Sequence, residues 1–383
     1  MARAFAFLMD NDFNIRAIFD DFLTLEWKRS FFIPAGAFEL QVNLNQFNSA
    51  EITKGTFIGV TDNPDRSVVD RVLRVEQIER ELGEGGPEDE LLSVTGRDVT
   101  GMLEERLALP PSGQEYDRQT DVAVETAMKH YVDNHAGPSA PANRQVPNLV
   151  IAADQARGEL VSFDARFQSI AEILETMSRA TLIGWEINFD FDNKEHVFDV
   201  IVGVDRTMNS ATPVLFDIEY NTVLSQHHLS TDLERKSFAY VASKGEGLDR
   251  TIVETFVEVN EPTGFNRREV FVDAQDIEAT RTDVLELKGN AALAETISED
   301  VVEAETPHIS QFQYRTDFDL GDIITVRNRK WSFTKDMRII GVVNRIEAGE
   351  GSIRQVFELD HPFPTLKDKI LAQFRAVEAG RRV

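Results

Sequence analysis

Residues 37–44 of this 383-residue chain read AFELQVNL, and this stretch decides the fold class of the region around it. Its apolar members Phe38, Leu40 and Val42 alternate with polar side chains such as Glu39. Successive side chains of a β-strand point to opposite faces, so a period of two places one apolar face on a core and one polar face in water. The segment therefore predicts a half-buried strand of an antiparallel sheet.

Short apolar runs of the same kind surround this strand. Two of them, residues 5–9 and 15–19, flank the polar segment 10–14, whose composition is typical of a hairpin turn. Further runs cover residues 27–33, 56–61 and 68–78. The acidic, glycine-rich segment 82–90 is expected to be a loop between two strands. We expect residues 1–109 to form an N-terminal β-barrel-like domain.

The hydrophobic period changes after residue 110. Val124, Ala127 and Met128 share one side of an expected helix, and Thr120 is the expected N-cap. A second helix is expected to end near Gly184, followed by two strands that flank the turn at residues 192–195. We expect residues 110–205 to form a small α+β module.

Strand-like runs return from residue 206 onward. We expect residues 206–362 to form a second β-barrel-like domain, with an acidic helical insertion near residues 276–305, and residues 363–383 to form a C-terminal helix or tail. The sequence shows no repeat of fixed period. The expected fold class is α+β and β-rich, with two barrel-like β domains and an intervening α+β module.

The composition excludes several classes of protein. Subtracting 66 Asp and Glu from 40 Lys and Arg gives a formal charge of −26, which disfavours gripping of nucleic acid or of anionic membranes. The absence of cysteine excludes disulfides, thiol catalysis and thiolate metal sites. The apolar run after Met1 is too short for a signal peptide or a membrane span, so we expect no membrane anchor.

One acidic segment near the N-terminus has the spacing of a calcium-binding loop. Asp10, Asp12, Asn14 and Asp21 carry the oxygen ligands, but Ile15 stands where such a loop requires glycine. A hairpin turn explains the same residues, and we expect the turn.

A second group of possible ligands is formed by Asp190, Asp192, Glu195 and His196. Phenylalanines alternate with these residues, so the pattern is typical of a hairpin with a polar tip. We expect these side chains to lie on the solvent face and tip of the hairpin rather than on a metal.

Two further groups have simple structural explanations. His227 and His228 are adjacent, and neighbours on a strand point to opposite faces, so we expect a solvated loop pair and not a shared metal. Asp317, Asp319 and Asp322 lead into an apolar strand with no histidine nearby in sequence. For them we expect a solvated acidic strand face.

The sequence carries no enzyme signature. It has no Gly-x-Ser-x-Gly elbow and no His-Glu-x-x-His helix, and the glycine-rich residues 82–87 lack the Lys-Ser or Lys-Thr of a phosphate-binding loop. Carboxylates are abundant, but no spacing selects one pair as acid and base. We therefore expect no catalytic, cofactor-binding or metal-binding residues, no cofactor, and a protein that is not an enzyme.

The order of several short segments resembles one protein family. These segments are, in chain order, Leu25-Glu26-Trp27-Lys28-Arg29, Gly36-Ala37-Phe38-Glu39-Leu40, Val94-Thr95-Gly96-Arg97-Asp98, Leu103-Glu104-Glu105-Arg106, Asn143-Arg144, Arg268-Glu269-Val270-Phe271-Val272-Asp273-Ala274, Asp317-Phe318-Asp319-Leu320-Gly321-Asp322, Thr325-Val326 and Arg338-Ile339. In this order the chain resembles the baseplate-hub or tail-tip proteins of long-tailed bacteriophages. The resemblance is to the Gp37-like siphophage tail family, which is related to the N-terminal hub region of tail-associated lysins.

That resemblance implies a structural role. It implies a homotrimeric ring that closes the distal tail tube, in which two barrel-like domains per subunit imitate the hexameric symmetry of the tube rings. The implied partners are the distal tail or tail-tube protein, the tape-measure protein, and tail fibres or receptor-binding proteins. The implied location is the tail tip of the virion, after assembly in the host cytoplasm.

The same resemblance implies that genomic DNA passes the ring without specific binding. We therefore expect carboxylates to outnumber bases on the channel-facing side, because such a wall offers phosphate no counterion to release. Relatives of the lysin type carry a wall-degrading region after the hub, whereas this chain ends shortly after Pro364, so receptor cutting and wall digestion are expected on other chains.

Two alternatives from other classes stay open. One is a β-rich receptor-binding or carbohydrate-binding tail protein, against which the 3 Trp and 5 Tyr count, beside 26 Phe. The other is a hydrolase that uses two carboxylates in a cleft. A measurement of mass in solution discriminates between them, because a hub assembles into a ring and an enzyme has no such requirement.

Overall fold

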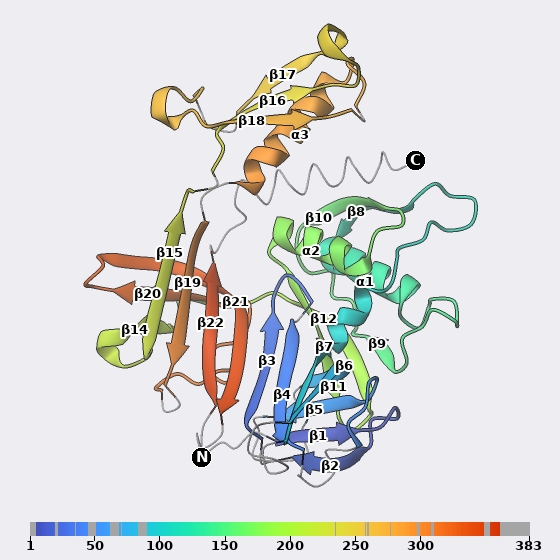
Figure 1. The fold of residues 1–383 in the computed structure, drawn as a ribbon, viewed down its shortest axis with the longest axis vertical. Coiled ribbons are helices and arrows are strands. Elements are labelled where there is room, and N and C mark those ends of the chain that lie inside the picture. The colour runs from blue at the N-terminus through green and yellow to red at the C-terminus, as the bar shows by residue number, and fades with distance from the viewer. Residues whose placement is uncertain are drawn as a thin grey trace.

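The fold is rich in strands and has few helices (Figure 1). The computed structural model describes residues 5–19, 22–34, 36–44, 51–61, 69, 71–82, 90–233, 235–256, 258, 260–275, 277–296, 299–307, 310–347 and 353–360. The loop expected at residues 82–90 is wrong at its two ends, because Leu82 and Glu90 lie in strands, and its residues 83–89 lie outside this part of the chain. The C-terminal helix or tail expected at residues 363–383 also lies outside it.

The N-terminal region is built from strands, as the alternating sequence pattern predicted. Their bounds are β1 Phe5–Met9, β2 Ile15–Phe19, β3 Thr24–Ser30, β4 Ala37–Asn43, β5 Phe57–Thr61, β6 Arg71–Leu82 and β7 Glu90–Asp98. β1 and β2 form the expected antiparallel hairpin. In β4 the side chains of Phe38, Leu40 and Val42 are buried, which confirms the face that the alternation assigned to the core.

The region after β7 contains two helices packed on short strands. Its elements are η3 Val99–Leu103, β8 Asp117–Ala123, α1 Val124–His135, β9 Leu149–Ile151, β10 Leu160–Ala165, α2 Ile170–Thr181, β11 Gly184–Asp190 and β12 Glu195–Ile201. The N-cap expected at Thr120 is wrong, because Thr120 lies in β8, which pairs with β10. The residue at the N-cap is Ala123, which makes no side-chain cap bond.

The C-terminal half returns to strands, with a small sheet and a helix inserted among them. Its elements are β13 Asp205–Arg206, β14 Leu215–Asp217, η4 Ile218–Tyr220, β15 Ser225–Thr231, β16 Phe238–Ala242, η5 Gly247–Asp249, β17 Ile252–Thr255, η6 Gly264–Asn266, β18 Glu269–Asp273, α3 Thr282–Glu295, β19 Glu299–Thr306, β20 Ile323–Asn328, β21 Phe333–Glu347 and β22 Arg354–Asp360. In Figure 1 the inserted sheet β17-β16-β18 and α3 stand apart at the top of the molecule.

The acidic helical stretch expected near residues 276–305 is only partly helical. The helix is α3, and it covers one face of the inserted sheet through buried Val284, Leu285 and Leu293. The end of the stretch is strand β19 instead, in which Val302 and Ala304 are buried between acidic neighbours. The apolar residues there recur with the period of two of a strand and not with the helical period, and they are buried on the core side of the long sheet.

A single long sheet connects the two halves of the chain. Its strand order is β15-β19-β22-β21-β3-β4-β7-β6-β5-β1-β2, and β20 branches from β21 to pair with β13 and β14. Among the described strands this path does not close, so the two expected barrels are not confirmed. What joins the N-terminal and C-terminal strands is the antiparallel pair of β21 with β3, seen at the centre of Figure 1.

The same strand pairing occurs twice along this sheet. In the N-terminal half β3 pairs with β4, β4 with β7, β7 with β6 and β6 with β5. In the C-terminal half β15 pairs with β19, β19 with β22, β22 with β21 and β21 with β20. The five strands also follow one another in the same chain order in both halves. The structure therefore contains a topological repeat that the sequence did not reveal.

A β-bulge fixes the alignment of the two copies of this repeat. The register of β6 against β7 shifts between Val75 and Gln77, and that of β21 against β22 shifts between Ile339 and Gly341. Val75 thus corresponds to Ile339, and both are buried. The N-terminal copy covers a core that includes Leu25. The other copy covers a separate core of the same kind, with Phe357, Val342 and Ile324 among its members.

Candidate interaction surface

The long sheet has one face on the two apolar cores and one face turned away from them. On the outer face Glu26 lies directly opposite Glu39 on one neighbouring strand and Arg345 on the other. Directly opposite residues share a face of a sheet, and so do residues two apart on one strand. Following these rules across eight strands, from β15 to β6, defines the face that we call the outer sheet face.

The outer sheet face carries more carboxylates than bases. Its exposed or half-buried charged members in the described strands are the acids Glu26, Glu39, Glu76, Glu79, Glu81, Glu303, Glu305, Glu347, Glu358 and Asp360 and the bases Lys28, Arg74, Arg97, Arg345 and Arg354. All of these side chains are half-buried or exposed. The surface is therefore a broad, net acidic wall with scattered ion pairs.

Some of these ion pairs connect the strands where the two halves meet. Lys28 of β3 reaches across β21 to Glu358 of β22, with 2.7 Å between Nζ and Oε1. Arg345 of β21 lies 3.7 Å from Glu26 of β3 and 2.9 Å from Glu347 on its own strand. These pairs are partly exposed, so each adds little stability.

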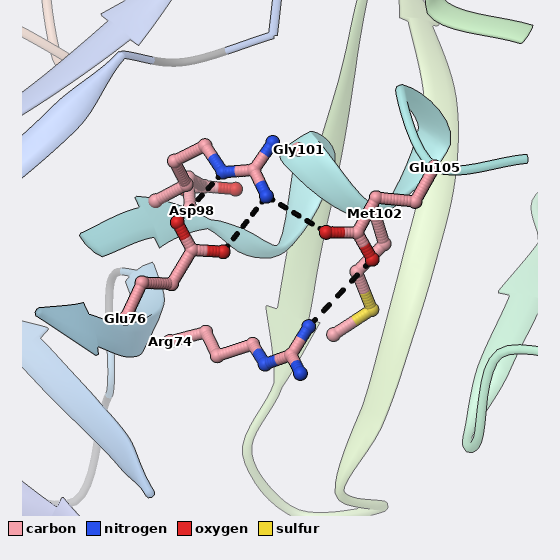
Figure 2. Close-up of a pocket in the computed structure, with 7 residues that line it drawn as sticks. Arg74, Glu76, Asp98, Gly101, Met102 and Glu105 are labelled. Carbon is pink, nitrogen blue, oxygen red and sulfur yellow. Dashed lines mark hydrogen bonds and ion pairs between the residues drawn. The ribbon is translucent and has the colours of Figure 1, made fainter. Parts of the chain in front are cut away.

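A cluster of charges lies at one end of the outer sheet face, where η3 follows β7, and Figure 2 shows three of its members, Arg74, Glu76 and Glu105. The central member is Arg97, whose guanidinium group bonds to several carboxylates. Its Nε lies 2.9 Å from Glu76, its Nη1 lies 2.6 Å from Glu104, and its Nη2 lies 2.8 Å from Glu105. Arg74 approaches Glu105 at 3.7 Å. The hydrogen bonds from Arg97 hold the pKa of Glu76 below its usual range. The guanidinium groups are committed to these carboxylates, so the cluster offers a bound anion little free positive charge.

A buried ionic joint ties three parts of the chain together beneath the sheet. Arg29 of β3 donates from Nη2 to Glu186 Oε2 of β11 at 2.8 Å and from Nη1 to Asp319 at 2.7 Å. Arg71 of β6 donates to the same Glu186 oxygen, and Tyr314 contacts Arg29. Arg29 and Arg71 are 4% and 3% exposed. These contacts connect the N-terminal strands to the α+β region and to the segment before β20 that carries Tyr314 and Asp319.

The charges of this joint sustain one another. Burial by itself raises the pKa of Glu186, but the positive charges of Arg29 and Arg71 outweigh it and hold that pKa well below its usual range. Asp98 lies nearby and is also buried, which raises its pKa, although Arg71 acts in the opposite direction. A buried charge that loses its partner costs several kcal/mol, about 3–5 for a paired group. The joint is therefore sensitive to any single substitution.

Asp117 is a second buried carboxylate, clamped by two histidines of α1. Its Oδ1 lies 2.8 Å from Nε2 of His130, and its Oδ2 lies 2.7 Å from Nε2 of His135. Asn134 and the Leu109 amide occupy the Nδ1 atoms, which leaves each Nε2–H to donate to the carboxylate. Burial opposes the charge, but the hydrogen bonds from both histidines lower the pKa of Asp117 to about 2. The group pins α1 to the start of β8.

The calcium-loop candidates near the N-terminus form a hairpin turn. Asp10 accepts hydrogen bonds at its Oδ1 from the backbone amides of Asp12 and Asn14, both at 2.9 Å. Arg16 pairs with the same carboxylate at 3.2 Å. Asp21 lies outside the described residues. The turn itself uses the carboxylate oxygens of Asp10.

The candidates at the β11–β12 hairpin separate from one another. Asp190 caps the turn through the amides of Asp192 and Asn193, as expected for a tip. His196 does not lie on the solvent face, because it is 1% exposed and its ring packs 4.7 Å from that of Phe13. Burial lowers its pKa to about 4, so the ring is a neutral part of the core.

His227 and His228 lie in strand β15, so the loop expected for them is wrong. They point to opposite faces, as adjacent strand residues must. His227 lies on the outer sheet face, 3.7 Å from Glu303. His228 packs against Phe333 on the core side, with ring centroids 4.7 Å apart.

The aspartates before β20 are structural and not merely solvated. Asp322 is 4% exposed, accepts from the Val204 amide at 2.7 Å and pairs with Arg206 at 3.3 Å. Asp319 enters the buried joint, and Asp317 accepts from the Gln313 amide at 2.8 Å. The expectation of a solvated strand face is therefore wrong for Asp322.

Sequence reasoning missed Arg29, Arg71, Glu186 and Asp117. One signal was available: Arg29 shares the core side of β3 with Leu25 and Trp27, and an arginine at such a position needs a buried partner. The partner itself cannot be read from the sequence. Within the described residues no helix is long and apolar enough to cross a membrane. In the same residues no group of three or more acidic or histidine side chains is arranged to hold a metal.

Comparison with known proteins gives a family and a fold. The family model described as "Siphovirus ReqiPepy6 Gp37-like protein" matches residues 5–357. No curated protein sequence matches the chain significantly.

Solved structures with a similar fold include phage tail proteins. The 43 kDa tail protein of prophage MuSo2 from Shewanella oneidensis aligns with a TM-score of 0.56 at 12% identity, covering 94% of this chain and 98% of that one. The tail protein from Neisseria meningitidis MC58 gives 0.54 at 12% identity, covering 96% and 98%. A chain of the lidless PdpA-VgrG complex gives 0.50 at 6% identity, covering 94% of this chain and 64% of that one. At these identities the likeness establishes the fold.

Proposed function

Because the chain belongs to the siphovirus ReqiPepy6 Gp37-like family and has the fold of phage tail proteins, we propose that it is the hub of the tail baseplate. Three copies form a ring that closes the distal end of the tail tube, and genomic DNA passes through that ring into the host. The role is structural and not catalytic, and the protein resides at the tail tip of the virion after assembly in the host cytoplasm.

The observation that carries this proposal is the repeated strand pairing in the long sheet. One chain presents two copies of the same five-strand unit side by side, joined by β21 and β3. Three such chains present six units, which matches a tube built from hexameric rings. A threefold ring can therefore continue a sixfold tube without a change in the spacing of its wall.

The outer sheet face supports the passage of DNA. In a ring of these units that face lines the channel, because the opposite face is occupied by the two cores. Its excess of carboxylates repels phosphate, and the bases present are paired with neighbouring acids, as Lys28 is with Glu358. DNA then slides past without releasing counterions or finding a binding site.

The inserted sheet supports contacts with other tail proteins. Leu248 of η5 and Phe265 of η6 have exposures of 103% and 102%, and Phe271 of β18 is 61% exposed. Large apolar side chains displayed this way are typical of protein contacts. The partners that we propose are the distal tail or tail-tube protein, the tape-measure protein and the tail fibres or receptor-binding proteins.

We also propose the domain division 1–109, 110–205, 206–362 and 363–383. In it the long sheet links the first and third segments, and the α+β segment braces them through Glu186. This arrangement needs no cofactor and no metal.

Mass in solution tests the proposal. Light scattering coupled to size exclusion should give three times the 43.2 kDa of one chain. A monomer at all concentrations would contradict the ring. A monomer that binds glycans would favour the receptor-binding alternative, and one that hydrolyses a substrate would favour the enzyme.

A separate assay tests the channel. Filter binding of duplex DNA at physiological salt should detect no complex with the purified chain. A charge-reversed variant, Glu39→Lys with Glu303→Lys and Glu347→Lys, should bind DNA, and that binding should fall steeply as salt rises. DNA binding by the native chain would contradict the proposal that the channel does not bind DNA.

A further inference from the structure

Two strand edges of the long sheet lack a partner among the described residues. The first is the outer edge of β15, which pairs with β19 on its other side. The second is the C-terminal half of β6. Its edge pairs with β5 only as far as Arg74, and its Val75 bonds to Thr56, while Gln77–Leu82 continue beyond. Open edges of this kind are templates for another strand.

The joint inside the chain shows how two such edges fit. β21 is the counterpart of β6, and β3 is the counterpart of β15. The N-terminal half of β21 pairs with β20, and the C-terminal half, beyond the bulge, pairs with β3. The register places Gly341 opposite Ser30 and Ile346 opposite Leu25.

The counterpart of each residue follows from pairs that both copies share. Thr24 lies opposite Gln41 as Ser225 lies opposite Glu305. Even the hydrogen bond that precedes each strand recurs, from the Leu23 amide to Gln41 at 2.8 Å. Its counterpart runs from Leu224 to Glu305 at 2.7 Å. Both β3 and β15 have seven residues, so the alignment has no gap.

We propose that the ring closes by pairing the C-terminal half of β6 in one copy with β15 of the next copy, antiparallel. Transferring the internal register places Gln77 opposite Thr231, Glu79 opposite Leu229 and Glu81 opposite His227 of the next copy. This proposal rests on the proposed ring and names the surface that forms it. It makes every junction of the ring equivalent to the β21–β3 joint.

The side chains on these edges suit each other. Glu81 corresponds to Arg345 and His227 to Glu26, so the acid and the base of the internal ion pair exchange strands. β15 carries no carboxylate between Ser225 and Thr231, so Glu79 and Glu81 meet no like charge there. Two β6 edges facing each other would instead bring Glu79 and Glu81 together, which disfavours that pairing.

Exposed apolar side chains lie where the junction would cover them. Leu82 is 66% exposed at the end of β6, and Leu224 is 58% exposed just before β15. In the transferred register Leu82 lies opposite Gln226 and diagonal to Leu224, within reach of it across the pair. Leu229 is 45% exposed and would lie against Glu79. Two strand edges that have no partner strand in the described part of the chain thus account for several exposed leucines at once.

The absence of native cysteine allows a direct test by cross-linking. In the full chain, the pair Glu79→Cys with Leu229→Cys puts two thiols directly opposite each other across the junction, at about 4.5–5.5 Å between Cα atoms. Mild oxidation should convert most of the chain into covalent dimers and trimers on a non-reducing gel, and reductant should reverse this.

The matched control keeps the same strands and face but shifts the register. Glu79→Cys with Ser225→Cys separates the thiols by four residues along β15, about 13 Å, and should not cross-link. The single variants should not cross-link either. Hydrogen exchange of the unsubstituted chain gives a second readout, with slowed amides in Gln77–Leu82 and Ser225–Thr231 only in the oligomer.

The outcomes separate this inference from the proposed function. Cross-linking in register, with none in the shifted control, supports the junction. The junction is contradicted, and the ring is not, if the protein is a trimer by mass but both cysteine pairs cross-link equally or neither does. In that case the amide hydrogens of the two strand edges also exchange freely in the trimer. A monomer under all conditions overturns both.

Discussion

Arg29 of β3 and Glu186 of β11 are joined by a 2.8 Å hydrogen bond in a site from which water is almost excluded. The contact spans two regions of the chain that are far apart in sequence, and Asp319 adds a third. The two copies of the strand repeat are therefore connected by these buried ionic contacts as well as by the β21–β3 pair. The predictions below probe these contacts separately.

Glu186→Gln should destabilise the whole central part of the molecule. The amide keeps the size of the side chain but leaves Arg29 and Arg71 with less compensating charge, so we expect a loss of about 3 kcal/mol in unfolding free energy. Trp27 and Trp185 are buried beside the joint, so tryptophan fluorescence in a urea titration reports the change. The exposed control Glu254→Gln should stay within about 0.5 kcal/mol of the native chain. Equal stability of both variants would mean that the negative charge of Glu186 does not stabilise the fold.

Acid should weaken the α+β region through Asp117. Its pKa in the folded chain is about 2, below the value of 3.8 for a free aspartate, so the ionised form stabilises the fold. That contribution is present in full above pH 4 and is lost as pH falls toward 2. Thermal melts between pH 6 and pH 2 should show this loss in the native chain. Asp117→Asn should already melt lower at pH 6 and lose less on acidification, whereas parallel curves would contradict the clamp.

Gly96→Ala should disrupt the N-terminal copy of the repeat. Gly96 lies opposite Val75 at the bulge, where an added Cβ would collide with the Arg74 carbonyl and lie 2.8 Å from the Phe38 ring. Overpacking of a core typically costs about 1–3 kcal/mol, so the variant should melt below the native chain. Ser93→Ala on the same strand is the control and should change little. A stable Gly96→Ala variant would show that the bulge can relax.

A double-mutant cycle on His227 and Glu81 should show that their charges interact across the ring junction. His227→Glu places a carboxylate opposite Glu81 of the next copy and should weaken trimerisation, by about 0.2–1 kcal/mol per junction. Adding Glu81→Arg recreates the charge order of Arg345 and Glu26 and should restore it. Sedimentation equilibrium measures the dissociation constants of all four proteins. Additive effects, with no recovery in the double variant, would contradict the register.

The strands and helices were largely readable from the sequence, because burial imposes its period on the side chains. The alternation in residues 37–44 gave β4, and the helical spacing of Val124, Ala127 and Met128 gave α1. The strand β19 was misread, since Val302 and Ala304 sit in an acidic stretch that also contains a helix. Local pattern sets such elements only when one period dominates.

The repeat and the buried joint could not be read in this way. Corresponding strands share pairing and burial but little identity: Trp27 corresponds to His228, and Lys28 to Leu229. The joint depends on Arg29 meeting Glu186, a pairing that only the folded chain brings about. Arg29 lies on the same face of its strand as Leu25 and Trp27, which indicated a buried charge but not which residue pairs with it. Recognition of the family, by contrast, came from the order of short segments and was confirmed by the match over residues 5–357.

Electron microscopy of the purified chain tests the central claim most directly. We expect a ring with threefold symmetry, a central opening, and six similar sheet units around it whose outer sheet face lines the opening. A compact particle without an opening, or a ring lined by the apolar cores and the inserted sheet, would contradict the account.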